Sequence, residues 1–180
     1  MSLRIYGNRL LKSLPGLDTR PTPARVREAL FNIWQDYMAG CRWLDLCAGT
    51  GAMSAEALCR GAAEVTAIEQ SNRAISIIRE NLQQVCGENQ KFVVLRGSVE
   101  QRIKSLAGKQ FDCIYFDPPY ASDLYGPVLE IVAEYELLSP DGEIAVEHKK
   151  EKMPVVTALE ICRQKVYGNT ALTFYQPIVL

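Results

Sequence analysis

The amino-acid sequence predicts an α/β fold of the Rossmann-like kind, in which a mostly parallel, doubly wound sheet carries helices on both faces and ends in an antiparallel hairpin. Three observations predict it. Short apolar segments alternate with segments of helical periodicity from residue 22 onward. A glycine-rich turn over 48–51 follows the first strand-like segment. Two extended segments around Gly168-Asn169 are typical of a β-hairpin.

The elements of the first half follow from helix caps and apolar spacing. Thr22 is expected to cap the first helix and Pro23 to take its first position, where proline costs no hydrogen bond. Ser71 can cap a later helix in the same way. In chain order we expect a helix over 22–38, a strand over 43–47, a helix over 52–60, a strand over 65–69, a helix after Ser71 and a strand over 92–95.

The second half continues the alternation and then changes character. The segment 111–116 is mostly apolar, which is typical of a strand buried on both faces. In chain order we expect a helix over 99–106, a strand over 111–116, a helix over 124–138, a strand over 143–147, a short helix around 153–159, and extended segments over 161–167 and 171–176.

Length and composition limit the class of protein. The chain has 180 residues, of which 48% are hydrophobic and 23% charged, with a net charge of −1. These values indicate one globular domain over 1–180, with a basic extension over 1–20 and a core over 21–180. No apolar stretch approaches the ~20 residues of a membrane span, and no secretory signal is recognisable. We therefore expect a cytoplasmic protein that contacts no membrane and is a monomer at this size.

The cysteines and the histidine do not predict a metal site. The six cysteines include no C-x-x-C pair, so we expect reduced, mostly buried thiols and no bound metal. His148 is the only histidine, and a lone histidine cannot form a histidine-based catalytic group. We expect it at the surface or at the end of a strand.

The turn after the first strand indicates a cofactor site. Glycines let a backbone turn tightly and approach a ligand closely, and doubly wound sheets bind ligands at the carboxyl ends of their strands. Ser54 stands where a dinucleotide-binding fingerprint would need a third glycine. Asp45 would repel a pyrophosphate but suits a cationic ligand, and Glu69, one strand later, can accept from ribose hydroxyls. S-adenosylmethionine carries both groups. The alternative is a tight turn without a ligand.

The segment Asp117-Pro118-Pro119-Tyr120 (117–120) follows the strand 111–116 at the same expected edge of the sheet. The Asp117 carboxylate and the Pro118 carbonyl are rigid acceptors suited to both hydrogens of an NH2 group, and Tyr120 offers a face on which a base can stack. Such acceptors would localise the lone pair of an exocyclic amine and aim it at a methyl donor. The alternative is a rigid turn that only ends the strand.

Positive charge is concentrated in the first 27 residues. They hold six basic residues and one acid, a net charge of +5, whereas residues 28–180 carry −6. Arginines beside an acidic body are candidate phosphate contacts. The alternative is ordinary solvated charge. The candidate RNA-binding residues are Arg20, Thr22, Arg25 and Arg27.

With these motifs the chain resembles the RsmD-type small-subunit rRNA guanine-N2 methyltransferases, of the class I S-adenosylmethionine-dependent superfamily. The matching stretches are Arg20-Pro21-Thr22, 25–32, 44–62, Glu69, Asn81-Leu82, 117–120 and Tyr167-Gly168. The resemblance implies a seven-stranded sheet and methyl transfer to the N2 amine of a guanine in 16S rRNA, within a small-subunit assembly particle. It implies cofactor contacts from Asp45, Cys47, Ala48, Gly49, Thr50, Gly51, Glu69, Gln70, Ser98 and Val99. It also implies that Asp117, Pro118, Pro119 and Tyr120 hold the base.

Other functions fit the same motifs. Adenine N6 in DNA and the amide of a protein glutamine both present a planar NH2 group to such acceptors. A non-catalytic module that binds S-adenosylmethionine or RNA is a further alternative. The Arg20-Pro21-Thr22 block with residues 25–32 favours the rRNA methyltransferase.

Overall fold

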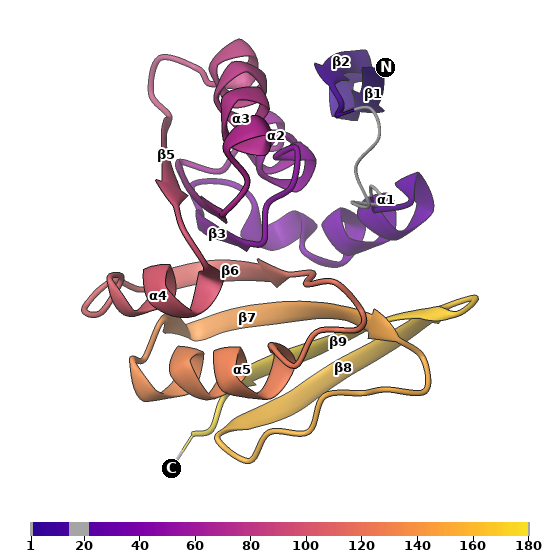
Figure 1. The fold of residues 1–180 in the computed structure, drawn as a ribbon, viewed down its shortest axis with the longest axis vertical. Helices are drawn as coiled ribbons and strands as arrows, with labels where there is room; N and C mark the ends of the chain where they lie inside the picture. The colour runs from indigo at the N-terminus through magenta and orange to yellow at the C-terminus, as the bar shows by residue number, and fades with distance from the viewer. Residues whose placement is uncertain (1, 15–21, 180) are drawn as a thin grey trace.

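A seven-stranded, mostly parallel sheet forms the centre of the computed structural model, which describes residues 2–14 and 22–179 (Figure 1). Its strand order is β5-β4-β3-β6-β7-β9-β8, with β9 antiparallel to both β7 and β8. The strands are β3 (Arg42–Leu46), β4 (Glu64–Glu69), β5 (Lys91–Arg96), β6 (Phe111–Phe116), β7 (Leu138–Lys149), β8 (Leu159–Tyr167) and β9 (Thr170–Pro177). The predicted Rossmann-like sheet with its terminal hairpin is therefore confirmed.

Helices cover both faces of this sheet and enclose two cores. One core contains buried residues of α1 (Ala24–Ile33), α2 (Ala52–Cys59) and α3 (Asn72–Val85), and the other contains those of α4 (Val99–Lys104) and α5 (Tyr125–Glu134). The apolar strands separate the two cores because successive side chains of a strand point to opposite faces.

The strand order reverses between β3 and β6. From β3 the chain moves outward to β4 and then β5, and it afterwards returns to place β6 and β7 on the other side of β3. Ligands of doubly wound sheets bind at such a switch point, outside the carboxyl ends of the strands. The turn after β3 and the segment after β6 both lie at this position.

An N-terminal hairpin lies against α2 and α3, apart from the main sheet (Figure 1). It consists of β1 (Ser2–Ile5), a 3-10 turn η1 (Tyr6–Asn8) and β2 (Arg9–Lys12). The buried Asn81 amide clips it to the body, because Oδ1 accepts from the Lys12 N–H at 2.9 Å and Nδ2 donates to the Lys12 carbonyl at 3.0 Å. Nδ2 also donates to the Thr50 carbonyl at 2.9 Å, which links the hairpin to the glycine turn.

Two expected helix boundaries were wrong. The first helix begins at Ala24 and ends at Ile33, followed by a 3-10 turn η2 (Gln35–Tyr37), and no side chain caps its N-terminus. Thr22 does not cap it because its hydroxyl contacts Tyr115 instead. The helix expected to reach 138 ends at Glu134, since Glu136 takes a left-handed φ of +50° and the Leu137 N–H returns to the Val132 carbonyl.

Near the end of β7 one expectation was wrong, and the strand-end alternative for His148 is confirmed rather than the surface one. No helix forms around 153–159, where the Pro154 carbonyl accepts from the Tyr175 hydroxyl rather than from a helical N–H. His148 is fully buried in β7, and its Nε2 lies 2.8 Å from Thr173 Oγ1 on β9. The antiparallel cover of β9 encloses it, and burial lowers the His148 pKa.

Candidate functional site

Acidic side chains gather at the carboxyl ends of four adjacent strands. Parallel pairing sets Leu46 of β3 level with Phe116 of β6, and Phe116 level with Val146 of β7. Asp117 and Glu147 each lie one residue beyond these pairs, and Glu69 ends the neighbouring β4. The register therefore brings side chains from distant parts of the sequence to one edge.

The turn after β3 depends on left-handed backbone conformations. Gly49 and Gly51 have φ of +58° and +76°, and Cys47 has the uncommon value of +64° for a residue with a side chain. A Cβ on Gly51 would lie 3.1 Å from the Ile78 side chain of α3, whereas one on Gly49 would meet nothing within 4 Å. Glycine at 51 thus permits close packing on α3, while Gly49 faces open space where a ligand can approach.

Asp45 is buried directly beneath this turn. Its exposed fraction is 1%, and Ser54 Oγ donates to its Oδ2 at 2.6 Å. Burial raises the Asp45 pKa to about 7, the Ser54 hydrogen bond lowers it, and Glu69 raises it again. A cationic ligand is the chemistry that would relieve this acid, so Asp45 fits the sulfonium and amino groups of S-adenosylmethionine. Ser54, which sequence analysis treated only as a missing glycine, positions the carboxylate.

Glu69 is held mainly by backbone groups. Its Oε1 accepts from the N–H groups of Gln70 and Ser71, and its Oε2 accepts from the Gly49 N–H, all at 2.8 Å. Of the roughly four acceptor positions of a carboxylate, about one is left for a ribose hydroxyl. A two-hydroxyl contact would therefore replace one of these backbone hydrogen bonds.

The burial of Cys47 raises its pKa to about 12, so its thiol stays protonated beside Glu69 and Asp45.

Ser98 and Val99 lie where β5 leads into α4. The Ser98 hydroxyl accepts from the Gln101 N–H at 3.4 Å and thereby caps α4, and the Val99 side chain is buried. The predicted cofactor contact of Ser98 must therefore compete with this cap or come from the backbone. Gly97 has a φ of +144°, and its N–H donates to the Glu69 carbonyl at 3.0 Å. This hydrogen bond keeps the turn close to β4.

Asp117 and Tyr120 emerge at the end of β6 beside a buried acid. Thr22 Oγ1 lies 3.5 Å from Asp117 Oδ2, so this threonine of the basic block contacts the site itself. The Tyr120 hydroxyl donates to Glu147 Oε1 at 3.2 Å, which orients its ring. Burial, then Glu147 and Asp45, raise the pKa of Asp117 well above its usual range. Glu147 was not among the site residues predicted from the sequence, where its only signal is its place near the end of an apolar strand.

The other predicted RNA-binding residues have different positions. Arg20 lies outside the described residues. Arg25 is exposed, with its guanidinium carbon 6.0 Å from the centre of the Tyr167 ring on β8. The expected RNA contact of Arg27 is wrong, because its side chain is only 3% exposed.

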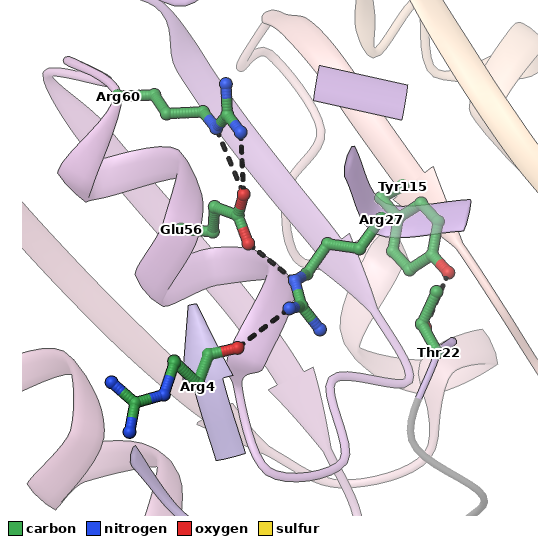
Figure 2. Close-up of polar contacts among 6 residues, drawn as sticks. All are labelled: Arg4, Thr22, Arg27, Glu56, Arg60 and Tyr115. Atoms are coloured by element: carbon green, nitrogen blue, oxygen red, sulfur yellow. Dashed lines mark hydrogen bonds and ion pairs between the residues drawn. The ribbon is translucent and has the colours of Figure 1, made fainter. Parts of the chain in front are cut away.

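Figure 2 shows what Arg27 does instead. Its Nε donates to Glu56 Oε2 at 2.6 Å, and its Nη2 donates to the Arg4 carbonyl at 2.8 Å. Arg60 donates to the other Glu56 oxygen at 2.9 Å. The guanidinium carbon of Arg60 also lies 4.4 Å from the centre of the Tyr6 ring. Arg27 therefore ties α1 to α2 and to the N-terminal hairpin.

Two properties of residues 2–14 and 22–179 bear on the class of site. Within that range no helix is long and apolar enough to cross a bilayer. No group of three or more His, Cys, Asp or Glu side chains in the same range is arranged to bind a metal ion.

Similar proteins are methyltransferases by their descriptions. The family model described as conserved hypothetical protein 95 matches residues 3–176. The chain is 35% identical over 173 residues to the Bacillus subtilis protein "Putative rRNA methyltransferase YlbH", covering 93% of each. It is 30% identical over 175 residues to the Haemophilus influenzae "Ribosomal RNA small subunit methyltransferase D", covering 96% of this chain and 90% of that one.

A solved structure agrees along nearly the whole chain. The Escherichia coli protein described as "Putative methyltransferase yhhF" has a TM-score of 0.84 at 30% identity, and 98% of each chain is covered. The likeness therefore extends over nearly the whole fold.

Proposed function

The chain belongs to the RsmD-type methyltransferase family, and from that premise we propose that it transfers a methyl group from S-adenosylmethionine to the N2 amine of a guanine in 16S rRNA. The observation that carries the proposal is the position of Asp117, at the switch point beside the glycine turn. A carboxylate there can receive an NH2 group next to a cationic methyl donor.

Cofactor binding falls to the ends of β3, β4 and β5. When bound, S-adenosylmethionine supplies a methyl group on a cationic sulfur. Asp45 contributes a buried negative charge, the Gly49 region allows close backbone approach, and Glu69 accepts from a ribose hydroxyl. The remaining proposed contacts come from Cys47, Ala48, Thr50, Gly51, Gln70, Ser98 and Val99.

The target base is received by the segment after β6. Asp117 and the Pro118 carbonyl accept the two amine hydrogens and localise the nitrogen lone pair, which a free aromatic amine delocalises into its ring. Tyr120 stacks on the base with its ring oriented through Glu147. Pro119 keeps the segment rigid. The base must leave its stack to enter, at a cost of a few kcal/mol.

RNA docking is assigned to exposed cations of the basic N-terminal block. Arg25 lies at the start of α1, close to the β8–β9 hairpin, and Arg4 and Arg9 are exposed on the N-terminal hairpin. The body carries net negative charge, which lowers its affinity for naked RNA. We therefore include a small-subunit assembly particle as the substrate form, with ribosomal proteins supplying part of the docking surface.

Methyl transfer from labelled S-adenosylmethionine tests the proposal. Small subunits and 16S rRNA that lack the modification should accept label on the N2 amine of one guanine. Asp117→Ala should lower the rate at least ~100-fold while cofactor affinity stays within about twofold, because Asp117 acts on the base and on the transition state.

Each alternative predicts a different outcome. Label on adenine N6 of DNA or on a protein glutamine would replace the proposal, and cofactor binding without transfer to any substrate would indicate a non-catalytic module. Weak cofactor binding in Asp117→Ala would show that Asp117 belongs to the cofactor site instead.

A further inference from the structure

A series of side-chain hydrogen bonds leads from Asp117 into the sheet. Thr22 Oγ1 lies 3.5 Å from Asp117 Oδ2 and 3.1 Å from the Tyr115 hydroxyl. The Tyr115 hydroxyl donates to Glu147 Oε2 at 2.7 Å. Tyr115 and Glu147 are only 2% and 3% exposed, so the series passes through the interior rather than along the surface.

The same series leaves the interior beside the terminal hairpin. The other oxygen of Glu147, Oε1, accepts from the Tyr120 hydroxyl at 3.2 Å, and that hydroxyl lies 3.1 Å from Thr170 Oγ1 at the start of β9. Tyr120 and Thr170 are half-buried, and Tyr120 lines a pocket that Lys149 also borders. Glu147 therefore connects the site of the proposed reaction with solvent.

Amine methylation needs such an exit. The nitrogen gains a bond to carbon, so one of its N–H protons must leave in every transfer. In the proposed complex the target base covers the face of Asp117 that would otherwise meet water, and Asp117 is the first acceptor within reach. A carboxylate that keeps this proton can no longer localise the lone pair of the next amine.

We propose that Glu147 receives this proton from Asp117 through Thr22 and Tyr115, and passes it to solvent through Tyr120. The inference rests on the proposed function and deepens it. Asp117 first takes the proton from the methylated amine and gives it to Thr22 Oγ1. The hydroxyl proton of Thr22 moves to the Tyr115 oxygen, and the Tyr115 proton moves to Glu147.

The relay is balanced and returns to its starting state. After one passage both hydroxyls are re-formed, Asp117 is ionised and Glu147 carries one proton. Glu147 touches no reacting atom and acts through Tyr115 and Thr22. Loss of its proton to water, through Tyr120, prepares the next cycle.

The charges around the pair favour sharing one proton. Asp117 and Glu147 each follow the last paired residues of the adjacent parallel strands β6 and β7, and Asp45 from β3 adds a third acid. Burial and these two acids raise the pKa of Asp117. From α5, the Tyr125 hydroxyl donates to the Glu147 backbone carbonyl at 3.0 Å, outside the relay. Along β7, the next cation is Lys149, whose Nζ lies 6.0 Å from the Tyr120 ring centre.

Methyl transfer over multiple turnovers, measured as a function of pH, tests the relay. Glu147→Gln and Tyr115→Phe should each lower the multiple-turnover rate at least ~10-fold at about pH 6 and much less at about pH 9, where Asp117 loses its proton to solvent once the methylated base has left. Affinities for S-adenosylmethionine and RNA should stay within about twofold. Tyr125→Phe is the matched control, because it removes a hydroxyl beside Glu147 that the relay does not use.

Two further measurements test the relay if the buried variants do not fold or if no methyl transfer is observed. Tyr120→Phe keeps the ring at a half-buried position and should show the same pH-dependent deficit even if the buried variants unfold. In the ligand-free protein, carboxyl carbon NMR should show Asp117 titrating at lower pH in Glu147→Gln than in wild type, and unchanged in Tyr125→Phe.

The outcomes separate the two ideas. If wild type methylates RNA and every relay variant keeps its pH profile, the relay is wrong and the proposed function stands. If wild type methylates nothing, the proposed function fails and the relay fails with it. Unchanged Asp117 titration in Glu147→Gln would also overturn the relay, since the two carboxyls would then not be coupled.

Discussion

Buried carboxylates in two regions of this protein have opposite electrostatic surroundings. Glu56, 1% exposed, lies between two arginines, with Arg27 Nε at 2.6 Å and Arg60 Nη2 at 2.9 Å from its two oxygens. Asp45 is equally buried, but the charged group with the largest effect on its pKa is another acid, Glu69.

The difference separates architecture from function. Paired with Arg27 and Arg60, Glu56 joins α1, α2 and the N-terminal hairpin as one unit. The acids Asp45 and Asp117, at the ends of β3 and β6, have raised pKa values, so they lower stability unless they are protonated or a cation arrives. Such an arrangement is typical of a site prepared for a positively charged ligand.

Glu56→Ala should have the largest effect on stability. It leaves the buried Arg27 without its carboxylate, and removing one partner of a buried pair costs about 3–5 kcal/mol. Urea denaturation measures the loss. Glu80→Ala, which removes the exposed partner of Lys12, is the control and should cost less than about 1 kcal/mol. Equal losses for the two variants would contradict the distinction.

Asp45→Asn should have the opposite effect on the ligand-free protein. The folded pKa of Asp45, about 7, lies above its unfolded value, so its contribution to stability is present below about pH 4 and is lost as the pH rises to about 7. Above that range the variant should be more stable than wild type by a few kcal/mol, because about 1.4 kcal/mol accompanies each pKa unit.

Denaturation at several pH values measures the free energy of unfolding, and calorimetric titration with S-adenosylmethionine measures the cofactor affinity. Cofactor affinity should fall at least ~10-fold in Asp45→Asn as stability rises. A variant that is less stable than wild type at about pH 8 would show that the carboxylate stabilises the fold after all.

Gly51→Ala should have an intermediate effect on stability. Comparing it with Gly40→Ala distinguishes backbone strain from close side-chain packing. Gly51 and Gly40 have nearly the same left-handed φ, +76° and +75°, but only a Cβ on Gly51 would press on Ile78. Gly40→Ala should cost about 1 kcal/mol through backbone strain, and Gly51→Ala should cost more and weaken cofactor binding. Thermal denaturation and cofactor titration of both variants provide the comparison.

Arg25→Ala should have the smallest effect on stability. Its side chain is exposed, so the change should stay within about 0.5 kcal/mol, in contrast to the arginine two positions later. RNA affinity measured against salt concentration should lose about one unit of slope if Arg25 contacts a phosphate. An unchanged slope would remove Arg25 from the RNA surface.

Much of the fold followed from local pattern. Apolar strands between amphipathic helices specify a parallel sheet, and the turn at 48–51 and the segment 117–120 both follow such strands. Because parallel strands share a carboxyl edge, the sequence alone could predict that Asp45, Glu69 and Asp117 lie near one another. The hairpin around Gly168-Asn169 was predictable for the same local reason.

What the sequence could not determine was which polar side chains would be enclosed. Arg25 and Arg27 read alike in the sequence, yet only the packing of α1 on α2 buries the second against Glu56. Thr22 read as a helix cap, and Glu147 as the end of an apolar strand. Their contacts with Tyr115 join segments separated by 93 and 32 residues, and no local periodicity encodes such distances. Local pattern therefore determined the sheet and its reactive edge. Tertiary packing alone decided which buried charges are paired with an opposite charge and which are available to a cationic ligand.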